Sequence, residues 1–274
     1  MNGQAIAAGV SPHDRGLHYG DGLFETIVCR QGKARFLPLH LERLALGCQR
    51  LRINLGDLEP LRNEVREAAA AAGDVLIKII VTRGEAVARG YGMAGSEVAT
   101  RLVFQYALPP DNEAVARDGI RVRVAQLRYG ENELLAGMKH LNRLEQVLAR
   151  CEAPAAEAAE LLVFSSSGFL VSGTMSNVFL VQENRLRTPR IDRCGVAGVM
   201  RRVILREAAE VGVSVEETIL TAADLKDAEE VFVTNARIVI WPVSSLEGHD
   251  LSVGPVTRRL QSRLATLMEQ PTDA

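Results

Sequence analysis

Cysteine is scarce in this chain, and the spacing of the few cysteines argues against both metal sites and disulfide bonds. The four cysteines, Cys29, Cys48, Cys151 and Cys194, form no CxxC or CxxH pair, which argues against a zinc site. A disulfide framework is not expected in a chain of 274 residues that shows no secretory signal. We therefore expect four reduced and mostly buried thiols.

Long apolar runs and blocks of one charge are also missing. The longest apolar run, LIKII, is interrupted by Lys78 and is far too short to span a membrane. The N-terminal MNGQAIAAGVSPHDRG lacks a basic region followed by an apolar core, so we do not expect it to act as a signal peptide. The formal net charge is -2 with both signs interspersed, and no basic stripe indicates nucleic acid. We expect a cytoplasmic protein that binds neither membrane nor nucleic acid.

The composition that remains is that of an ordinary globular protein. Hydrophobic residues make up 47% and charged residues 24%, and the length suits two modest domains. The segment ALPPDNEAVARDG (107–119) begins with adjacent prolines and continues with polar residues, which is typical of a loop at a domain boundary. We predict an N-terminal domain over 1–109, a linker over 110–119 and a larger C-terminal domain over 120–274.

Strand and helix patterns alternate along both predicted domains. In the first domain we expect strands over 22–30, 33–39, 75–84 and 101–108, and helices over 40–53 and 58–73. In the second we expect strands over 120–127, 160–166, 168–173 and 176–182, a strand pair over 229–243, and helices over 141–151, 198–212 and 256–269. The mixture predicts an α/β or α+β fold, and the short strands of the second half favour a barrel-like sheet.

Lysine chemistry has few candidates, because only four of the 32 basic residues are lysines. Lys139 lies between a strand-rich segment and a helix, and Lys78 lies inside an apolar strand, where alternation places it on the side of Leu76 and Ile80. A deprotonated lysine amine can bind an aldehyde covalently. Lys33 and Lys226 stand in polar surroundings and are weaker candidates. The residues alone leave both Lys139 and Lys78 open.

Two further segments have polar or glycine residues where a ligand can approach. Gly195 lies just before the predicted helix over 198–212 and Gly198 lies at its start, and the N-terminus of a helix can bind a phosphate through free N–H groups. Thr234 and Asn235 interrupt an apolar strand run, which indicates a bend or a ligand contact. Both segments are equally compatible with ordinary turns.

These segments resemble, in order and over essentially the whole chain, the fold-type-IV family of enzymes that use pyridoxal phosphate (PLP). That family includes branched-chain aminotransferases, D-amino-acid aminotransferases and aminodeoxychorismate lyases. Its two-domain fold has a small α/β N-terminal domain and a larger C-terminal domain with a barrel-like sheet. KHLNRLEQ (139–146) and the RGY of TRGEAVARGY (82–91) are closest to the lyase branch. The other matching segments are DRGLHYGDGLFET, LPLHLERL, GTMSNVFLV, GVAGVMR and EVFVTNARIVIWPV.

The resemblance implies roles for individual residues. Lys139 would be the lysine that holds PLP covalently, and Arg43 would contact the PLP phosphate, which a planar guanidinium suits. Val199 and Met200 would offer backbone N–H groups to the same phosphate. Asn235 and Ala236 would form a second loop on the phosphate side.

One residue departs from the family pattern. The family usually carries glutamate in the strand before a turn of small residues, as the first residue of E-G-T-x-x-N, where it keeps the pyridine nitrogen of PLP protonated. Here the segment reads LVSGTMSN, and Ser172 stands in that position. Serine supplies no negative charge, but it can donate a hydrogen bond to a neutral nitrogen. We therefore expect Ser172 to face the cofactor ring and the ring nitrogen to be mostly unprotonated.

The lyase branch implies conversion of 4-amino-4-deoxychorismate to 4-aminobenzoate and pyruvate, a step toward folate. A dicarboxylate substrate requires cationic or polar partners, and Arg89, Tyr91 and Tyr19 are the candidates. Family members are usually homodimers, so we expect a homodimer here. An aminotransferase acting on D- or branched-chain amino acids and a degenerate PLP-binding homologue remain as alternatives, the latter because of Ser172.

Overall fold

The computed structural model describes residues 9–86 and 89–269, and the chain divides into two compact units. Among the described residues, the first unit holds the chain up to Pro109 together with Met138–Asn142, and the second holds Pro110–Gly137 and the chain from Arg143 on. The sequence placed 138–142 within the C-terminal domain. The contacts of this segment, which includes Lys139, instead join it to the first unit.

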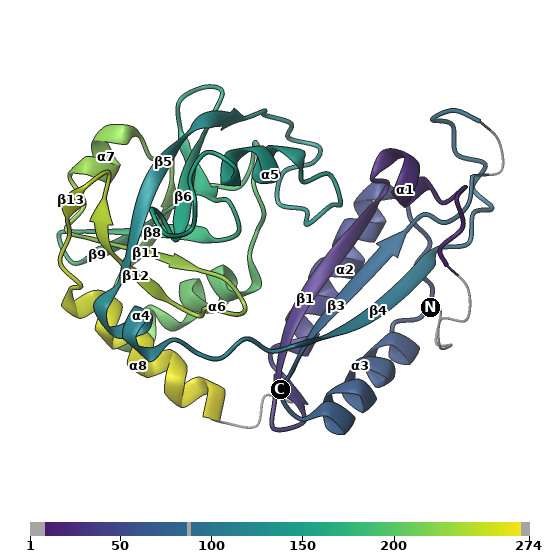
Figure 1. The fold of residues 1–274 in the computed structure, drawn as a ribbon, viewed down its shortest axis with the longest axis horizontal. Coiled ribbons are helices and arrows are strands. Elements are labelled where there is room, and N and C mark those ends of the chain that lie inside the picture. The colour runs from purple at the N-terminus through teal and green to yellow at the C-terminus, as the bar shows by residue number, and fades with distance from the viewer. Residues whose placement is uncertain (1–8, 87–88, 270–274) are drawn as a thin grey trace. The chain divides into compact units, whose positions relative to one another are not determined.

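The first unit is built on a sheet with the strand order β2-β1-β3-β4, of which β1, β3 and β4 are labelled in Figure 1. Its strands are β1 (Gly22–Arg30), β2 (Lys33–Ala34), β3 (Val75–Thr82) and β4 (Thr100–Ala107), all paired antiparallel. Burial alternates along β3, where Val75, Ile77, Ile79 and Val81 are buried and the residues between them are half-buried up to Ile80. This alternation gives the sheet one closed face and one partly open face.

Helices α2 (Leu37–Leu51) and α3 (Glu59–Ala72) pack against this sheet, and a short α1 (Arg15–Tyr19) precedes β1. The strand predicted over 33–39 is wrong beyond Ala34. Phe36 has a φ of 52°, which ends the extended chain, and α2 begins at Leu37 with Pro38 in its first turn. Proline tolerates this position because the first N–H groups of a helix have no partner within the helix.

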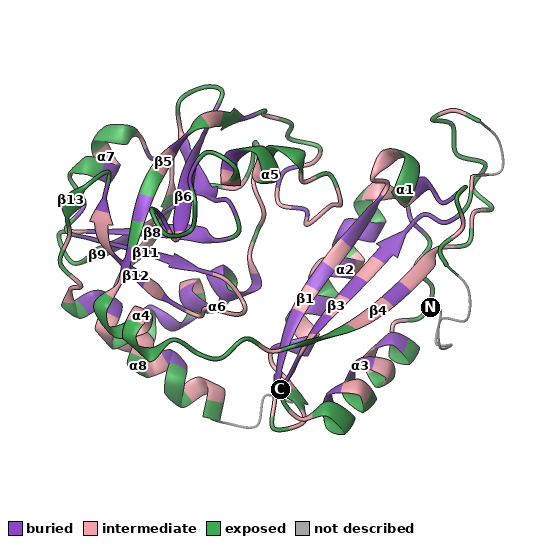
Figure 2. Cartoon of the chain, viewed as in Figure 1, coloured by how far each residue is buried: buried purple, intermediate pink, exposed green. Residues whose placement is uncertain are grey.

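The second unit contains a curled sheet of nine strands among its described residues, with the order β10-β9-β8-β11-β12-β5-β6-β7 and β13 paired to β12. The predicted barrel-like sheet is thereby confirmed. Strands β6, β8 and β11 are buried along almost their whole length, as Figure 2 shows. The strand bounds are β5 (Ile120–Tyr129), β6 (Glu160–Ser165), β7 (Leu170–Gly173), β8 (Asn177–Gln182), β9 (Arg185–Pro189), β10 (Val215–Thr218), β11 (Glu230–Thr234), β12 (Trp241–Leu246) and β13 (His249–Asp250).

The helices of the second unit differ in detail from the predicted ones. The segment predicted as a linker contains α4 (Glu113–Asp118), whose first turn is capped by the Asn112 side chain. Helix α5 (Leu144–Arg150) is shorter than predicted, because the residues before it pair with β1 instead. Helix α6 (Val199–Glu207) ends early and continues as a 3₁₀ turn (Ala209–Val211). The remaining helices are α7 (Ala222–Lys226) and α8 (Pro255–Glu269).

Three features of the described residues bear on the predicted chemistry. No helix within 9–86 or 89–269 is both long and apolar enough to cross a membrane. The same residues contain no cluster of three histidine, cysteine or acidic side chains arranged to hold a metal ion. All four cysteines are free thiols, and burial raises the pKa of Cys29 and Cys48 to about 12.

Candidate active site

Lys139 lies against β1 of the first unit. Its carbonyl oxygen accepts a hydrogen bond from the Phe24 N–H at 2.9 Å, and its Nζ stands 4.1 Å from the centroid of the Phe24 ring. The Nζ of Lys78, on the partly open face of β3, stands 5.4 Å from the same centroid. The two lysines that the sequence left open therefore share one aromatic ring, which attracts both ammonium groups through its face.

The backbone that carries Lys139 is fixed by hydrogen bonds to the start of β1 and to the turn before it. The Leu141 N–H donates to the Gly22 carbonyl at 2.9 Å, and Asn142 Nδ2 donates to the Gly20 carbonyl at 3.2 Å. A Cβ at Gly22 would lie 2.3 Å from the Val81 carbonyl oxygen, so only glycine fits here. Gly22 therefore lets both Val81 of β3 and Leu141 approach the start of β1 closely.

Arg43, predicted to contact phosphate, is held by a buried carboxylate. Its Nε and one terminal nitrogen donate to Glu25 at 2.7 and 2.5 Å, and His40 Nδ1 lies 2.7 Å from the same carboxylate. Burial alone would raise the Glu25 pKa, but the Arg43 charge and the His40 hydrogen bond outweigh it and bring that pKa to about 2. Burial lowers the pKa of His40, so this ring is neutral at pH 7.

The three predicted substrate residues lie in the first unit. The rings of Tyr19 and Tyr91 pack with centroids 5.2 Å apart, whereas Arg89 is an exposed residue two positions earlier. The buried Arg15 organises this loop, because its guanidinium donates to the carbonyls of Gly90, Tyr91 and Gly92, each at 3.2 Å. Arg15 was missed by the sequence reasoning, and no local pattern marks an arginine as buried.

The second unit positions Val199 and Met200 at the start of α6. Gly198 is the N-cap, and no side chain caps this end of the helix. A Cβ at Gly198 would lie 2.1 Å from Asn177 Oδ1, while Asn177 Nδ2 donates to the Val196 carbonyl at 2.9 Å. The helix therefore begins with backbone N–H groups that no capping side chain occupies, as a phosphate site requires.

Asn235 and Ala236 lie in the turn between β11 and β12. Asn235 Oδ1 accepts the N–H groups of Arg237 and Ile238 at 2.9 and 3.0 Å, and its Nδ2 donates to the Met175 carbonyl at 3.1 Å. Ala236 is half-buried in the same turn. Asn235 thus joins this turn to the turn that follows β7.

Ser172 is a buried residue of β7, and its Oγ donates to the Gly173 carbonyl at 2.8 Å. The following turn is held by the buried Glu160, whose carboxylate accepts hydrogen bonds from the Thr174 N–H at 3.0 Å and the Ser176 hydroxyl at 2.7 Å. Glu160 was not singled out in the sequence. It fixes the turn from one strand away, a contact that sequence spacing does not reveal.

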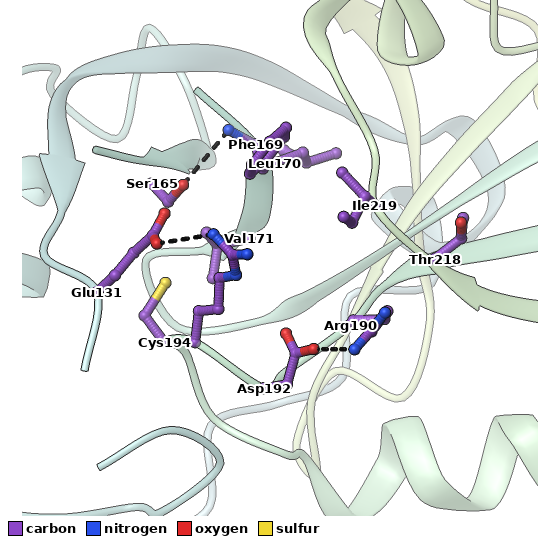
Figure 3. A pocket seen from close by; sticks show the side chains of 11 residues that line it. Glu131, Ser165, Phe169, Leu170, Val171, Arg190, Asp192, Cys194, Thr218 and Ile219 are labelled. Atoms are coloured by element: carbon purple, nitrogen blue, oxygen red, sulfur yellow. Dashed lines mark hydrogen bonds and ion pairs between the residues drawn. The ribbon is translucent and has the colours of Figure 1, made fainter. Parts of the chain in front are cut away.

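A separate pocket in the second unit contains none of the predicted site residues (Figure 3). Its walls include Val171, Cys194 and Glu131, whose carboxylate lies 3.3 Å from Arg193. The Arg190 and Asp192 side chains pair with each other at its edge. Ion pairs join these charged side chains, although Glu131 Oε1 is buried without a hydrogen-bond partner.

The comparisons with known proteins identify the family. A sequence model described as amino-transferase class IV matches residues 22–246. The chain belongs to the class IV aminotransferase family. An aminodeoxychorismate lyase from Vibrio harveyi is 34% identical over 257 residues, covering 92% of this chain and 94% of the relative. A D-alanine aminotransferase from Staphylococcus haemolyticus is 30% identical over 276 residues, covering 95% and 94%.

Solved structures of class IV members agree with this assignment. The 4-amino-4-deoxychorismate lyase of Pseudomonas aeruginosa superimposes with a TM-score of 0.93 at 43% identity, covering 98% of each chain. A hypothetical aminotransferase from Mycobacterium tuberculosis, in its PLP-bound form, has a TM-score of 0.82 at 21% identity, covering 96% and 95%, which supports the fold alone. The family and fold expected from the sequence are confirmed, and the roles of the single site residues stay predictions.

Proposed function

We propose that this chain is a PLP-dependent lyase that converts 4-amino-4-deoxychorismate to 4-aminobenzoate and pyruvate. The observation that carries the proposal is Lys139 at the head of the KHLNRLEQ block, with its Nζ over the Phe24 ring and a second lysine beside the same ring. The likeness to the Pseudomonas aeruginosa lyase over 98% of both chains supports the same reaction.

The chain's residues fit the cofactor. Lys139 would hold it covalently, Arg43 would contact its phosphate, and the N–H groups of Val199 and Met200 would bind the same phosphate. No side chain caps the start of α6, which leaves its N–H groups available for the phosphate. Glycine is required at position 198, because a side chain there would collide with Asn177. Ser172, Asn235 and Ala236 complete the proposed contacts.

The proposed chemistry uses Lys139 as a base and an acid. Bound PLP supplies an electron sink for the bond-breaking step. The substrate amine would replace Lys139 on the cofactor, and the Nζ of Lys139 that is thereby freed would accept the proton from the ring carbon that bears the amine. Elimination of the enolpyruvyl group makes the ring aromatic, and Lys139 returns a proton to the leaving enol. Aromatisation supplies most of the driving force.

The substrate carboxylates need cationic or polar partners, and Lys78 joins Arg89 and Tyr91 as a candidate. Lys78 is half-buried on the open face of β3, and its Nζ shares the Phe24 ring with Lys139. A partly buried ammonium binds a carboxylate more strongly than an exposed one, because less water competes for it. Arg89 is exposed, so we assign Lys78 the larger share of this binding.

An aminotransferase activity on D-amino acids is the second candidate. It is favoured by the 30% identity to the Staphylococcus haemolyticus D-alanine aminotransferase. Both activities would use Lys139, and they differ in product. The lyase releases pyruvate from the substrate, whereas the aminotransferase moves an amino group to an α-keto acid.

We further propose that the enzyme is a cytoplasmic homodimer. Leu144, Val147 and Leu148 share one face of α5 by their spacing, and 76%, 55% and 59% of their surfaces are exposed within a single chain. Exposed apolar faces of this kind are typical of subunit contacts. The four free thiols suit a reducing compartment. Light scattering on the purified protein tests the dimer, and a monomer at micromolar concentration would contradict it.

The decisive experiment incubates the PLP-loaded protein with enzymatically made 4-amino-4-deoxychorismate and follows 4-aminobenzoate and pyruvate. Equal amounts of both products are expected, and amino transfer to an α-keto acid without 4-aminobenzoate would favour the aminotransferase. Borohydride reduction and peptide mapping should place the pyridoxyl label on Lys139. A label on Lys78 would overturn the assignment, and no label at all would indicate a degenerate homologue.

A further inference from the structure

Tyr129 is a fully buried tyrosine whose hydroxyl makes no hydrogen bond of good geometry, although the Gln146 and Ser172 side chains lie within reach of it. The residue ends β5 and is 1% exposed, and it packs with Val163 and Val171 in one core cluster. A buried polar group is normally hydrogen-bonded, and each exception calls for an explanation such as an absent ligand or water. A phenylalanine would fill the same space without this cost.

The register of the sheet places Tyr129 near Ser172. Strand β6 lies between β5 and β7, with Tyr129 opposite Ser165 on one side and Ser172 opposite Val163 on the other. Directly opposite residues share a face of the sheet, and Val163 packs in the cluster that contains Tyr129. The hydroxyl of Tyr129 accordingly lies beside the side chains of Ser172 and Gln146.

Gln146 adds a second unsatisfied atom to the same place. It lies on α5 within the KHLNRLEQ block, and its Oε1 is buried without a hydrogen-bond partner. Burial raises the pKa of Tyr129 to about 12, so its hydroxyl stays protonated and remains a donor. The Ser172 hydroxyl donates its proton to the carbonyl of the next residue, Gly173, and its oxygen can still accept a hydrogen bond.

We propose that Tyr129 is a positioning residue, which donates its proton to Ser172 Oγ and so frees the serine proton for the ring nitrogen of bound PLP. This inference rests on the proposed function, in which Ser172 faces that ring. One hydroxyl can accept one hydrogen bond and donate another, so the pair Tyr129–Ser172 forms a neutral chain that ends on the ring. Two hydroxyls thereby take the place of one carboxylate, and Gln146 holds the Tyr129 oxygen by donating an amide N–H to it, since the single Tyr129 proton goes to Ser172.

The test compares Tyr129→Phe, Ser172→Ala and the double variant, all loaded with PLP labelled with ¹⁵N in the ring. We expect each single variant to move the ring-nitrogen resonance in the same direction and to weaken PLP binding about two- to tenfold, as the loss of one neutral hydrogen bond would. The double variant should differ little from Ser172→Ala, because the two hydroxyls act as one unit. Ser165→Ala is the matched control, since it removes a buried serine hydroxyl opposite Tyr129 and should leave the resonance in place.

Each other outcome rejects a defined part of the scheme. A resonance that moves in Ser172→Ala but not in Tyr129→Phe, or two effects that add, would overturn the role of Tyr129. A resonance unmoved in both would overturn the placement of Ser172 as well. Wild-type protein that takes up no PLP on Lys139 would reject the proposed function itself. If Tyr129→Phe does not fold, 3-fluorotyrosine at position 129 gives a more acidic hydroxyl, and the resonance should move in the opposite direction.

Discussion

Glu25 accepts two hydrogen bonds from the Arg43 guanidinium, at 2.7 Å from Nε and 2.5 Å from a terminal nitrogen, while 1% of the Glu25 residue is exposed. Such a pair contributes little net stability by forming, but breaking it leaves a charge buried without its counter-charge. The consequences of this pairing for stability and for cofactor binding can be measured separately.

The first prediction concerns acid stability. The folded-state pKa of Glu25 is about 2, below the ordinary value of 4.5, so its contribution to stability is complete above pH 4.5 and is lost as the pH falls toward 2. The loss should reach about 3 kcal/mol over this window. The depressed His40 pKa acts in the same direction at higher pH, because the unfolded histidine takes up a proton that the folded one does not.

Urea denaturation at pH 7 and pH 4 checks this. Glu25→Gln should lower the free energy of unfolding at pH 7 by about 3–5 kcal/mol and flatten its dependence on pH below 4.5. Glu42→Gln, which changes an exposed residue of α2 next to Arg43, is the control and should keep the wild-type slope. An unchanged slope in Glu25→Gln would mean that other carboxylates dominate the acid limb.

The second prediction concerns PLP affinity. Arg43→Ala should weaken PLP binding by about 1.5–3 kcal/mol, the range for a hydrogen bond to a charged group. Because this variant also leaves Glu25 unpaired, the double variant Glu25→Gln/Arg43→Ala should recover stability without recovering affinity. Arg50→Ala, on the exposed surface of the same helix, should bind PLP normally. Unchanged affinity in Arg43→Ala would show that the arginine serves Glu25 alone.

The fold was largely predictable where a pattern is local. The apolar runs of β6, β8 and β11 and the alternation along β3 were visible in the sequence, and the proline pair marked the end of the first unit. The start of α2 was not, because it depends on the left-handed backbone of Phe36. A helix cap or a positive φ at a large residue leaves no periodic signal.

The site was predictable only as far as the resemblance reached. Lys139 and Arg43 follow from family motifs, but their partners Phe24 and Glu25 come from another strand, and their contacts depend on long-range packing. Glu160 and Arg15 are buried charges, and a sequence cannot distinguish them from the many exposed ones. Tyr129 could not be linked to Ser172, because strand β6 lies between them.

The third prediction concerns substrate binding by Lys78. Lys78→Met keeps the length of the side chain and removes its charge, so KM for 4-amino-4-deoxychorismate should rise about tenfold, as the loss of one charged hydrogen bond implies. Pyridoxyl labelling of Lys139 should persist in this variant. Lys33→Met removes an exposed lysine of the same unit and should keep the wild-type KM. If Lys78→Met leaves KM unchanged, Lys78 does not bind the substrate carboxylate, and Arg89 and Tyr91 are the remaining candidates.

The last prediction concerns the ring electronics set by Ser172. A neutral hydroxyl cannot offset the charge of a buried protonated ring, so desolvation should favour the unprotonated nitrogen. An unprotonated ring is a weaker electron sink, which penalises amino-group transfer more than the lyase reaction, because aromatisation drives the latter. Ser172→Glu restores a carboxylate that Tyr129 can still reach as a donor. It should therefore raise any side transaminase activity by a larger factor than lyase turnover, with Ser172→Ala raising neither. Kinetics of both reactions on the three proteins, with ¹⁵N resonances of labelled PLP, measure this. Equal changes in both activities, or a protonated nitrogen in the wild-type enzyme, would show that Ser172 does not set the charge of the ring.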